Sequence, residues 1–237
     1  MLRFHASEAH FMNDKNENGL IINNLYLKSK ELTNRFESFR NKLNKVFVLS
    51  LGKSRDCLPM WLIYGNTGSG ISLRFDFKQL KNSFKVVSLK DIDTKKRNDE
   101  VLLIECNYLS NNNILQYAKS YRNNLKNALN LGKTDYELIE MFNDIQIKSM
   151  SLKYNYFNYE TEYRLLKQSK NVLLKNGRYG ITLYQIIEIP LCAIKEILIG
   201  PMCNYDTTIE AVNALSKKIY DKFGIEIKVT KSLINIK

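Results

Sequence analysis

Segments typical of strands and segments typical of helices do not alternate regularly along this chain, and that irregular order is the strongest constraint on its fold. β-Branched and apolar runs bounded by turn residues predict strands at residues 46–51, 69–77, 101–108, 163–167, 181–189, 196–199 and 226–229. A doubly wound parallel sheet needs a crossover helix between successive strands, so this order disfavours that class. We predict one α+β domain over residues 1–237, in which a mixed, mainly antiparallel sheet, or a pair of small packed sheets, is flanked by about four helices.

The four helices are indicated by periodicity and by signals at their ends. The first has one apolar stripe at helical spacing, made by Leu32, Phe36, Phe39 and Leu43. The second, over about residues 114–131, stops at Gly132, and the fourth, over about residues 208–223, stops at Gly224. The third opens with a capping box at Thr134, three residues before a glutamate.

The chain carries a formal net charge of +12, which favours an anionic partner such as nucleic acid. The alternative is an ordinary solvated surface, because the basic residues are spread along the chain and interleaved with acids, as in residues 90–100. With 44% hydrophobic and 25% charged residues, the composition is that of a soluble globular protein. Charge alone does not decide between these two interpretations.

No segment has the character of a membrane span or of a secretion signal. The longest apolar stretch, residues 186–202, is interrupted by Glu188, Lys195 and Glu196, whereas a membrane helix needs about 20 predominantly apolar residues. Met1 is followed closely by charged residues, so a signal peptide is not expected. We predict a cytoplasmic protein without a membrane partner. Its four cysteines have no paired short spacing, which predicts free thiols and not a zinc or redox motif.

The pattern K-x3-F-x2-E-x-E-x-R at residues 153–164 is chemically the most distinctive segment. On a strand, Glu160, Glu162 and Arg164 would point to the same face. Two carboxylates about 7 Å apart along a strand can divide labour, one binding a substrate hydroxyl and the other activating a nucleophile or stabilising a developing cation. Arg164 would keep the nearer carboxylate ionised. The alternative is a solvent-facing ladder of charges on an antiparallel strand.

A second candidate segment covers residues 46–77. Its first strand reaches a hydroxyl at Ser50, and a polar loop then leads to Trp61 and Tyr64, which would share a helical turn and could stack a flat ring. Packing in the core is the alternative for Trp61. The glycine-rich run at residues 65–70 lacks the Lys-Ser/Thr pair and the following helix of a phosphate-binding loop. We interpret it as a tight turn into the next strand.

The N-terminal segment holds several residues of metal-ligand type, namely His5, His10, Asp14 and Glu17. Their spacing matches no standard metal site, and we expect no metal. A metal-dependent hydrolase built on His5, His10 and Asp14 is nevertheless a third functional hypothesis. Asn13 and Asp14 are expected to brace the loop through hydrogen bonds from side chain to backbone.

Taken in order, these segments resemble a bacterial family, domain of unknown function 2971. The matching stretches are Phe11-Met-Asn13-Asp14-Lys-Asn-Glu17, Phe47-Val-Leu-Ser50, Met60-Trp61-Leu-Ile-Tyr64 with Gly70 following, Lys153-x3-Phe157-x2-Glu160-x-Glu162-x-Arg164, and the closing Ile197-Leu-Ile-Gly200-Pro201. They span nearly the whole chain. Phe157 stands where the family usually has tryptophan.

The layout is also similar, more distantly, to that of ADP-ribosyltransferases, which split NAD at its nicotinamide bond. This resemblance implies that Glu162 holds a ribose hydroxyl and favours an oxocarbenium-like transition state, and that Glu160 orients the acceptor. Ser50 would support the ribose on the nicotinamide side, and Trp61 or Tyr64 would stack a ring. Such enzymes begin with a strand that grips NAD. Here either Arg3 and His5 do that work, or the N-terminal strand is absent.

The leading hypothesis is therefore an NAD-dependent, ADP-ribosyltransferase-like effector of bacterial, anti-phage defence or of toxin type. NAD would be a substrate, a nucleic acid the expected target, and a neutralising or regulatory protein a further partner. The alternative is a non-catalytic module of the same fold that binds nucleic acid or a protein.

Overall fold

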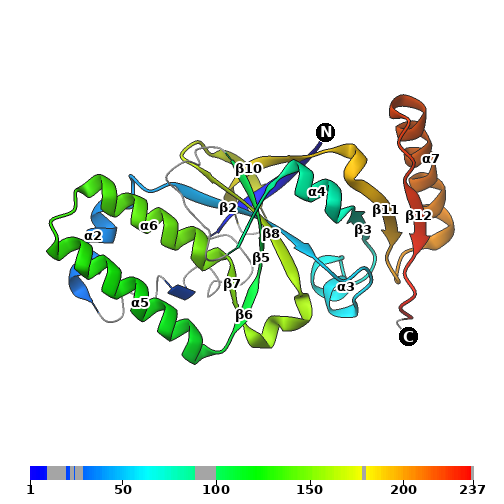
Figure 1. Cartoon of the computed structure of the whole chain (residues 1–237). Helices are drawn as coiled ribbons and strands as arrows, with labels where there is room; N and C mark the ends of the chain where they lie inside the picture. The colour runs from blue at the N-terminus through cyan, green and yellow to red at the C-terminus, as the bar shows by residue number, and fades with distance from the viewer. Residues whose placement is uncertain (10–19, 22–23, 25–28, 89–99, 178–179, 236–237) are drawn as a thin grey trace. The chain divides into compact units, whose positions relative to one another are not determined.

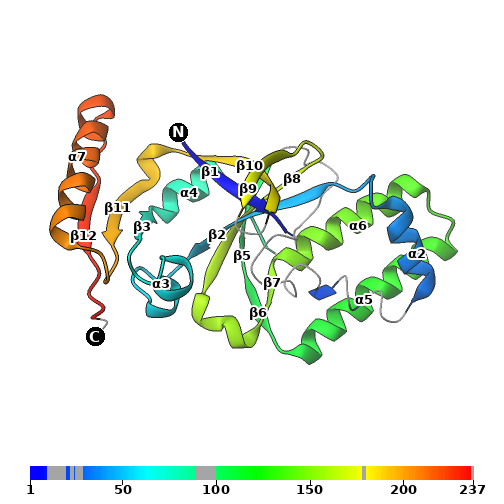
Figure 2. The same ribbon diagram turned by 180° about the vertical axis from the view of Figure 1, so that it is seen from behind.

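The structure of the chain is a computed structural model, and it describes residues 1–9, 20–21, 24, 29–88, 100–177 and 180–235. The chain forms two compact units. The larger unit consists of residues 4–51 and 85–187, and the smaller unit of residues 1–3, 52–84 and 188–237. Figure 1 and Figure 2 show the elements of both units from opposite sides. The prediction of one domain over the whole chain stays a prediction.

A seven-stranded sheet with the order β4-β5-β8-β2-β1-β10-β9 forms the framework of the larger unit. Its strands are β1 (Leu2–Glu8), β2 (Lys45–Gly52), β4 (Lys85–Val87), β5 (Val101–Glu105), β8 (Glu162–Ser169), β9 (Leu173–Gly177) and β10 (Gly180–Ile189). The pairs β1/β2, β5/β8 and β9/β10 are antiparallel, whereas β4 and β5 are parallel. The sheet is mixed and mainly antiparallel, as predicted, and the N-terminal residues contribute one of its strands, β1.

The larger unit also contains α-helices and a small ladder. They are α2 (Lys30–Phe39), α5 (Asn111–Asn130), α6 (Asp135–Met150) and the parallel pair of β6 (Asn107–Leu109) with β7 (Leu152–Tyr154). The predicted capping box is present at α6, where the Thr134 hydroxyl accepts the Glu137 N–H and the Glu137 carboxylate accepts the Thr134 N–H. The positive φ of Gly132, 67°, ends the α5 segment as expected.

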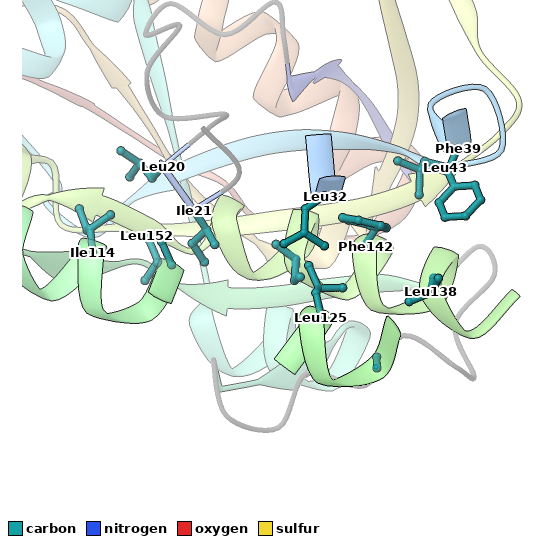
Figure 3. Packing of buried hydrophobic residues seen from close by; sticks show 13 residues of the cluster. Leu20, Ile21, Leu32, Phe39, Leu43, Ile114, Leu125, Leu138, Phe142 and Leu152 are labelled. Atoms are coloured by element: carbon teal, nitrogen blue, oxygen red, sulfur yellow. The ribbon is translucent and has the colours of Figure 1, made fainter. Parts of the chain in front are cut away.

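The core of this helical layer is apolar. Figure 3 shows buried side chains from α2, α5 and α6 together with Leu20, Ile21, Leu43 and Leu152. A second buried cluster lies between the sheet and α6, and it joins Val46 and Val48 of β2 and Leu166 of β8 to Ile147 and Met150 of α6. One face of the sheet is therefore covered by the C-terminal half of α6, which fixes the position of the residues that follow α6 in the chain.

The smaller unit is a three-stranded sheet with helices. Its elements are α3 (Leu58–Tyr64), β3 (Ile71–Phe75), α4 (Phe77–Ser83), η4 (Leu191–Ala193), β11 (Ile194–Ile199), α7 (Tyr205–Phe223) and β12 (Lys228–Lys231). The central strand β11 pairs parallel with β12 and antiparallel with β3. The buried side chains of Ile194, Ile197, Val212 and Ile227 form its core.

Most predicted elements are present, with shifted ends. The strand predicted at residues 69–77 ends at Phe75, because Asp76 caps the N-terminus of α4 by accepting the N–H groups of Lys78 and Gln79. The last strand lies at Lys228–Lys231 and not at residues 226–229. Among the residues described, none of the helices combines the length and the apolar character required to span a bilayer.

Candidate functional site

The pattern K-x3-F-x2-E-x-E-x-R was predicted to place Glu160, Glu162 and Arg164 on one strand, but the segment from Lys153 to Arg164 contains three short elements. Lys153 lies on β7, η3 (Asn155–Glu160) is a 3-10 helix, and β8 begins at Glu162. Between the two glutamates, Thr161 adopts a left-handed backbone with φ 36° and ψ 71°. This turn ends η3, so Glu160 is not on the strand, and that part of the prediction is wrong.

The charged side chains of this segment nevertheless converge in the interior. Relative exposure is 2% for Lys153, 4% for Glu160, 3% for Glu162 and 0% for Arg164. Buried charges of this kind are tolerated when each has a partner of opposite sign. A solvent-facing ladder of charges, the alternative interpretation, is therefore excluded by burial.

Lys153 bridges the two glutamates. Its Nζ is in close ion-pair contact with Glu160 Oε2, and it lies 3.2 Å from Glu162 Oε1. The same ammonium group lies 5.3 Å from the centroid of the Phe157 ring. The 3-10 turns of η3 bring Phe157 and Glu160 back over Lys153, which explains why these residue types occur four and seven positions after the lysine.

Arg164 fixes Glu162 from within the sheet. Its Nε and Nη2 lie 2.7 Å and 2.6 Å from Glu162 Oε1, as expected for residues two apart on one face of a strand. Its Nη1 donates to the carbonyl of Met150 at 2.7 Å. Arg164 thus ties the start of β8 to the end of α6.

The Glu162 carboxylate is ionised and held mainly through one oxygen. Burial alone would raise its pKa, but the charges of Arg164 and Lys153 outweigh that effect and lower the pKa below its usual range. The Cys106 thiol also donates to Oε1, at 3.4 Å. The contacts of the Glu162 carboxylate with the side chains of Cys106, Arg164 and Lys153 are all made through its Oε1 atom.

Two neighbours of Glu162 were not identified from the sequence. Cys106 lies between β5 and β6, and burial raises the pKa of its thiol well above the usual range. Tyr108, on β6, accepts the backbone N–H of Glu162 at 2.9 Å, and burial raises its pKa to about 12. Nothing in the sequence near either residue signals its contact with β8, because the contact depends on the pairing of strands far apart in the chain.

Ser50 and His5 lie on the same face of the sheet as Glu162. Leu166 shares a face with Glu162 by strand alternation, and it packs with Val48 of β2. Ser50 is on the Val48 face for the same reason. Ser7 of β1 is paired with Val48 in the register, which places His5 there as well.

The three strands concerned, β8, β2 and β1, are consecutive neighbours in the sheet. Val46 and Val48 are buried on this face, whereas Ser50 and His5 are exposed. This face of the sheet is therefore buried near Val46 and Val48 and exposed near Ser50, towards the C-terminal end of β2. The centroids of the His5 ring and of the Tyr184 ring on β10 are 4.3 Å apart.

Other predicted site residues belong to the smaller unit. Arg3 pairs with Glu188 there at 2.9 Å. Trp61 and Tyr64 share α3, as predicted, but Trp61 is only 4% exposed and its indole N–H donates to Asp56 at 2.6 Å, whereas Tyr64 is 54% exposed. The environment of Trp61 is that of a core residue with a satisfied polar edge.

Asp56 gives this tryptophan a clear structural role. Besides the indole it accepts the Ser232 hydroxyl at 2.8 Å and the Leu233 N–H at 2.8 Å. Trp61 therefore helps to hold the residues that follow β12. The glycine-rich run at residues 65–70 is a turn, as interpreted, and its Gly70 and Gly68 carbonyls accept the N–H groups of Gly200 and Met202.

The smaller unit has its own buried charge, which the sequence did not reveal. Glu196 on β11 receives Arg55 through two contacts, Nε to Oε2 at 2.9 Å and Nη2 to Oε1 at 2.6 Å. Arg74 adds a weaker contact at 3.4 Å, and the Thr230 hydroxyl also donates to Glu196. These partners come from three separate segments, so this cluster ties the smaller unit together.

Asn13 and Asp14, with His10 and Glu17, lie outside the described residues, so their predicted roles are not tested. Within the described ranges, no group of three or more His, Cys, Asp or Glu side chains is arranged to hold a metal ion.

A known family model matches part of the chain. The model of a family described as "Protein of unknown function (DUF2971)" matches residues 60–165, which include Trp61, Lys153 and both glutamates. This match supports the family resemblance read from the sequence motifs. Neither a curated protein nor a solved structure shows significant similarity to the chain.

Proposed function

We propose that the chain is an NAD-dependent ADP-ribosyltransferase-like effector whose reaction centre is Glu162. The observation that carries the proposal is the position of an ionised Glu162, held through Oε1, on the same sheet face as the exposed Ser50 and His5. All residues assigned a role lie in the larger unit. Bacterial defence or toxin action is the biological setting that we expect for such an effector.

The proposed reaction breaks the bond between nicotinamide and ribose. Nicotinamide leaves with the electron pair of that bond, and positive charge develops on the ribose. A buried, ionised carboxylate stabilises such a cation, because the charge lies in surroundings of low dielectric constant. Arg164 and Lys153 contact Oε1 of Glu162, and in this proposal Oε2 accepts a ribose hydroxyl.

The remaining groups have supporting roles in this proposal. The acceptor's nucleophile forms a bond to the ribose carbon that nicotinamide leaves, and its proton passes to Glu160 or to water. Ser50 binds the ribose, and His5, beside Tyr184, contacts the nicotinamide end. Lys153 fixes the distance between the two carboxylates by contacting both. Pre-set positions of this kind reduce the reorganisation needed in the transition state.

The experiment is labelling with NAD that carries a detectable adenylate. The protein is incubated with cellular RNA, DNA and protein fractions, and transfer to each is measured. Glu162→Gln should lower transfer at least about a hundredfold. Ser50→Ala should lower it too, and because Ser50 is exposed, this variant should keep its fold.

Glu196→Gln is the matched control, since Glu196 is an equally buried and ion-paired carboxylate in the smaller unit. It should retain transfer. If the wild type and Glu162→Gln are equally inert under conditions in which another ADP-ribosyltransferase labels its own target, the proposal fails.

A second candidate function is a non-catalytic module that binds nucleic acid or a protein. It is favoured by the burial of Glu160 and Glu162 and by their pairing with Lys153 and Arg164, an arrangement that also suits a purely structural role. This candidate predicts salt-sensitive binding that survives Glu160→Gln and Glu162→Gln in folded protein. Neutralisation of surface lysines should weaken that binding.

A further inference from the structure

The segment η3 carries a ridge of aromatic side chains beside the buried glutamates. We call Tyr154, Tyr156, Phe157 and Tyr159 the tyrosine ridge. The rings of Tyr154 and Tyr156 are stacked, with centroids 5.1 Å apart and planes 13° apart, and the Tyr156 and Phe157 centroids are 4.6 Å apart. Phe157 in turn lies over Lys153. The ridge is thus continuous from the ion-pair cluster to the surface.

The outer rings of the ridge are open to solvent. Tyr156 is 61% exposed and Tyr159 is 42% exposed. Packing against Tyr154 and Phe157 orients the Tyr156 ring before any ligand arrives, so little side-chain entropy would be lost when a ligand binds to this ring. Asn155 and Asn158, on the same short helix, are exposed as well. Exposed rings next to amide groups can stack on a nucleobase and hydrogen-bond to its edges.

The side-chain chemistry of the ridge suits a nucleobase. Residues 154–159 carry no charged side chain, and the adjacent Lys153 is buried. The exposed side chains of η3 are aromatic or amide groups, with no aliphatic residue among them. Aromatic and amide side chains suit planar bases that can form hydrogen bonds. Attraction for the phosphates has to come from outside the ridge.

A source of attraction for phosphate lies next to the ridge. In the β6/β7 ladder Leu109 is paired with Tyr154, so the N-terminus of α5 begins one residue beyond the strand that runs beside the ridge. The first turn of α5 contains no acidic residue, and its side chains from Asn111 to Asn113 are exposed. The partial positive charge of a helix N-terminus favours an anion there. The net charge of +12 acts in the same direction over longer range.

We infer that the tyrosine ridge binds single-stranded nucleic acid, with bases stacked on Tyr156 and Tyr159 and a phosphate near the N-terminus of α5. The inference rests on the proposed function and deepens it. It identifies the acceptor of the transfer reaction as single-stranded nucleic acid bound beside Glu160. Binding itself needs no NAD. The two ideas can therefore fail separately.

Binding is measured by fluorescence anisotropy with labelled 12-residue oligothymidylate and oligouridylate, without NAD, at low salt and during a salt titration. The wild type should bind with a salt-dependent affinity. Tyr156→Ala and Tyr159→Ala should each weaken binding about tenfold, the size typical of one lost base stack. Tyr156→Phe should bind within about twofold of the wild type, because it keeps the ring.

The matched control is Tyr136→Ala, which removes a tyrosine of the same unit that is 71% exposed on α6. It should leave binding unchanged. Equal binding by the wild type, Tyr156→Ala and Tyr159→Ala would overturn the inference. No binding of either oligonucleotide by the wild type at low salt would also overturn it. If the wild type binds the oligonucleotides but transfers no label from NAD, only the proposed function is contradicted.

Discussion

Arg164 and Glu162 are two residues apart on β8, and the guanidinium of the first contacts Oε1 of the second through both Nε and Nη2, at 2.7 Å and 2.6 Å. Both side chains are buried, and Arg164 also holds the Met150 carbonyl. Replacing Arg164 by methionine would leave Glu162 in the interior with Lys153 as its main cationic partner. We expect a loss of about 3–5 kcal/mol in the free energy of unfolding, measured by urea titration.

The control for this variant is Arg40→Met. Arg40 forms a surface pair with Glu37 at 3.5 Å, with both side chains mostly exposed. Such pairs contribute about 0–1 kcal/mol. Similar losses in the two variants would show that the contact between Arg164 and Glu162 has no special weight in the fold.

The pH dependence of stability should reflect the two buried carboxylate clusters. Hydrogen bonds from Arg55 lower the pKa of Glu196 to about 2. The pKa of Glu162 is also lowered, because the charges of Arg164 and Lys153 outweigh the effect of burial. An unfolded glutamate titrates near pH 4.3. Because the folded values are lower, the stabilisation is complete above about pH 4.3 and is lost as the pH falls towards 2.

Glu196→Gln should therefore be less stable than the wild type at pH 7 and should lose less stability between about pH 4.5 and 2. The measurement is the urea midpoint at a series of pH values. A variant whose stability falls as steeply as that of the wild type over this range would contradict the assignment of the low pKa to Glu196.

Trp61→Phe should loosen the residues that follow β12. Phenylalanine keeps most of the buried ring but loses the N–H that donates to Asp56 at 2.6 Å. Asp56 would still accept hydrogen bonds from Ser232 and Leu233, but the indole would no longer hold the Asp56 carboxylate in place. We expect a loss of about 1.5–3 kcal/mol in the free energy of unfolding, the usual contribution of one hydrogen bond to a charged group. Hydrogen exchange at the Leu233 amide should be faster. Unchanged exchange at that amide would show that Asp56 does not need the indole.

How much of this could be predicted from the sequence depends on whether the signal is local. The capping box at Thr134 and the left-handed Gly224 after α7 were predictable, because each depends on a few neighbouring residues. The strand positions were approximately right for the same reason. The order of the strands was not predictable, since it depends on contacts between residues far apart in the chain.

The candidate site shows the same division. The pattern at residues 153–164 pointed to Glu160, Glu162 and Arg164 as neighbours, and Lys153, which it also contains, lies with them in the structure. Alternation along a strand was the wrong basis for Glu160, because Thr161 takes a left-handed conformation that no local rule for threonine predicts. The contact of Cys106 with Glu162, 56 positions later, and that of Arg55 with Glu196, 141 positions later, had no local signal.

An added methyl group should be poorly tolerated at Gly200 in the smaller unit. A Cβ there would lie 2.3 Å from the Gly68 carbonyl oxygen and 2.7 Å from that of Gly70. Both carbonyls are fixed, because they accept the N–H groups of Met202 and Gly200. Backbone atoms cannot move aside as a flexible side chain can, so Gly200→Ala must separate the turn at residues 65–70 from the end of β11. We expect a loss of about 3 kcal/mol or more in the urea unfolding free energy.

Gly224→Ala is the comparison, since its Cβ would meet nothing within 4 Å and only its φ of 65° would be strained. That strain should cost about 1 kcal/mol. An equal effect of the two substitutions would mean that the close approach of Gly200 to the turn is not what requires glycine at this position.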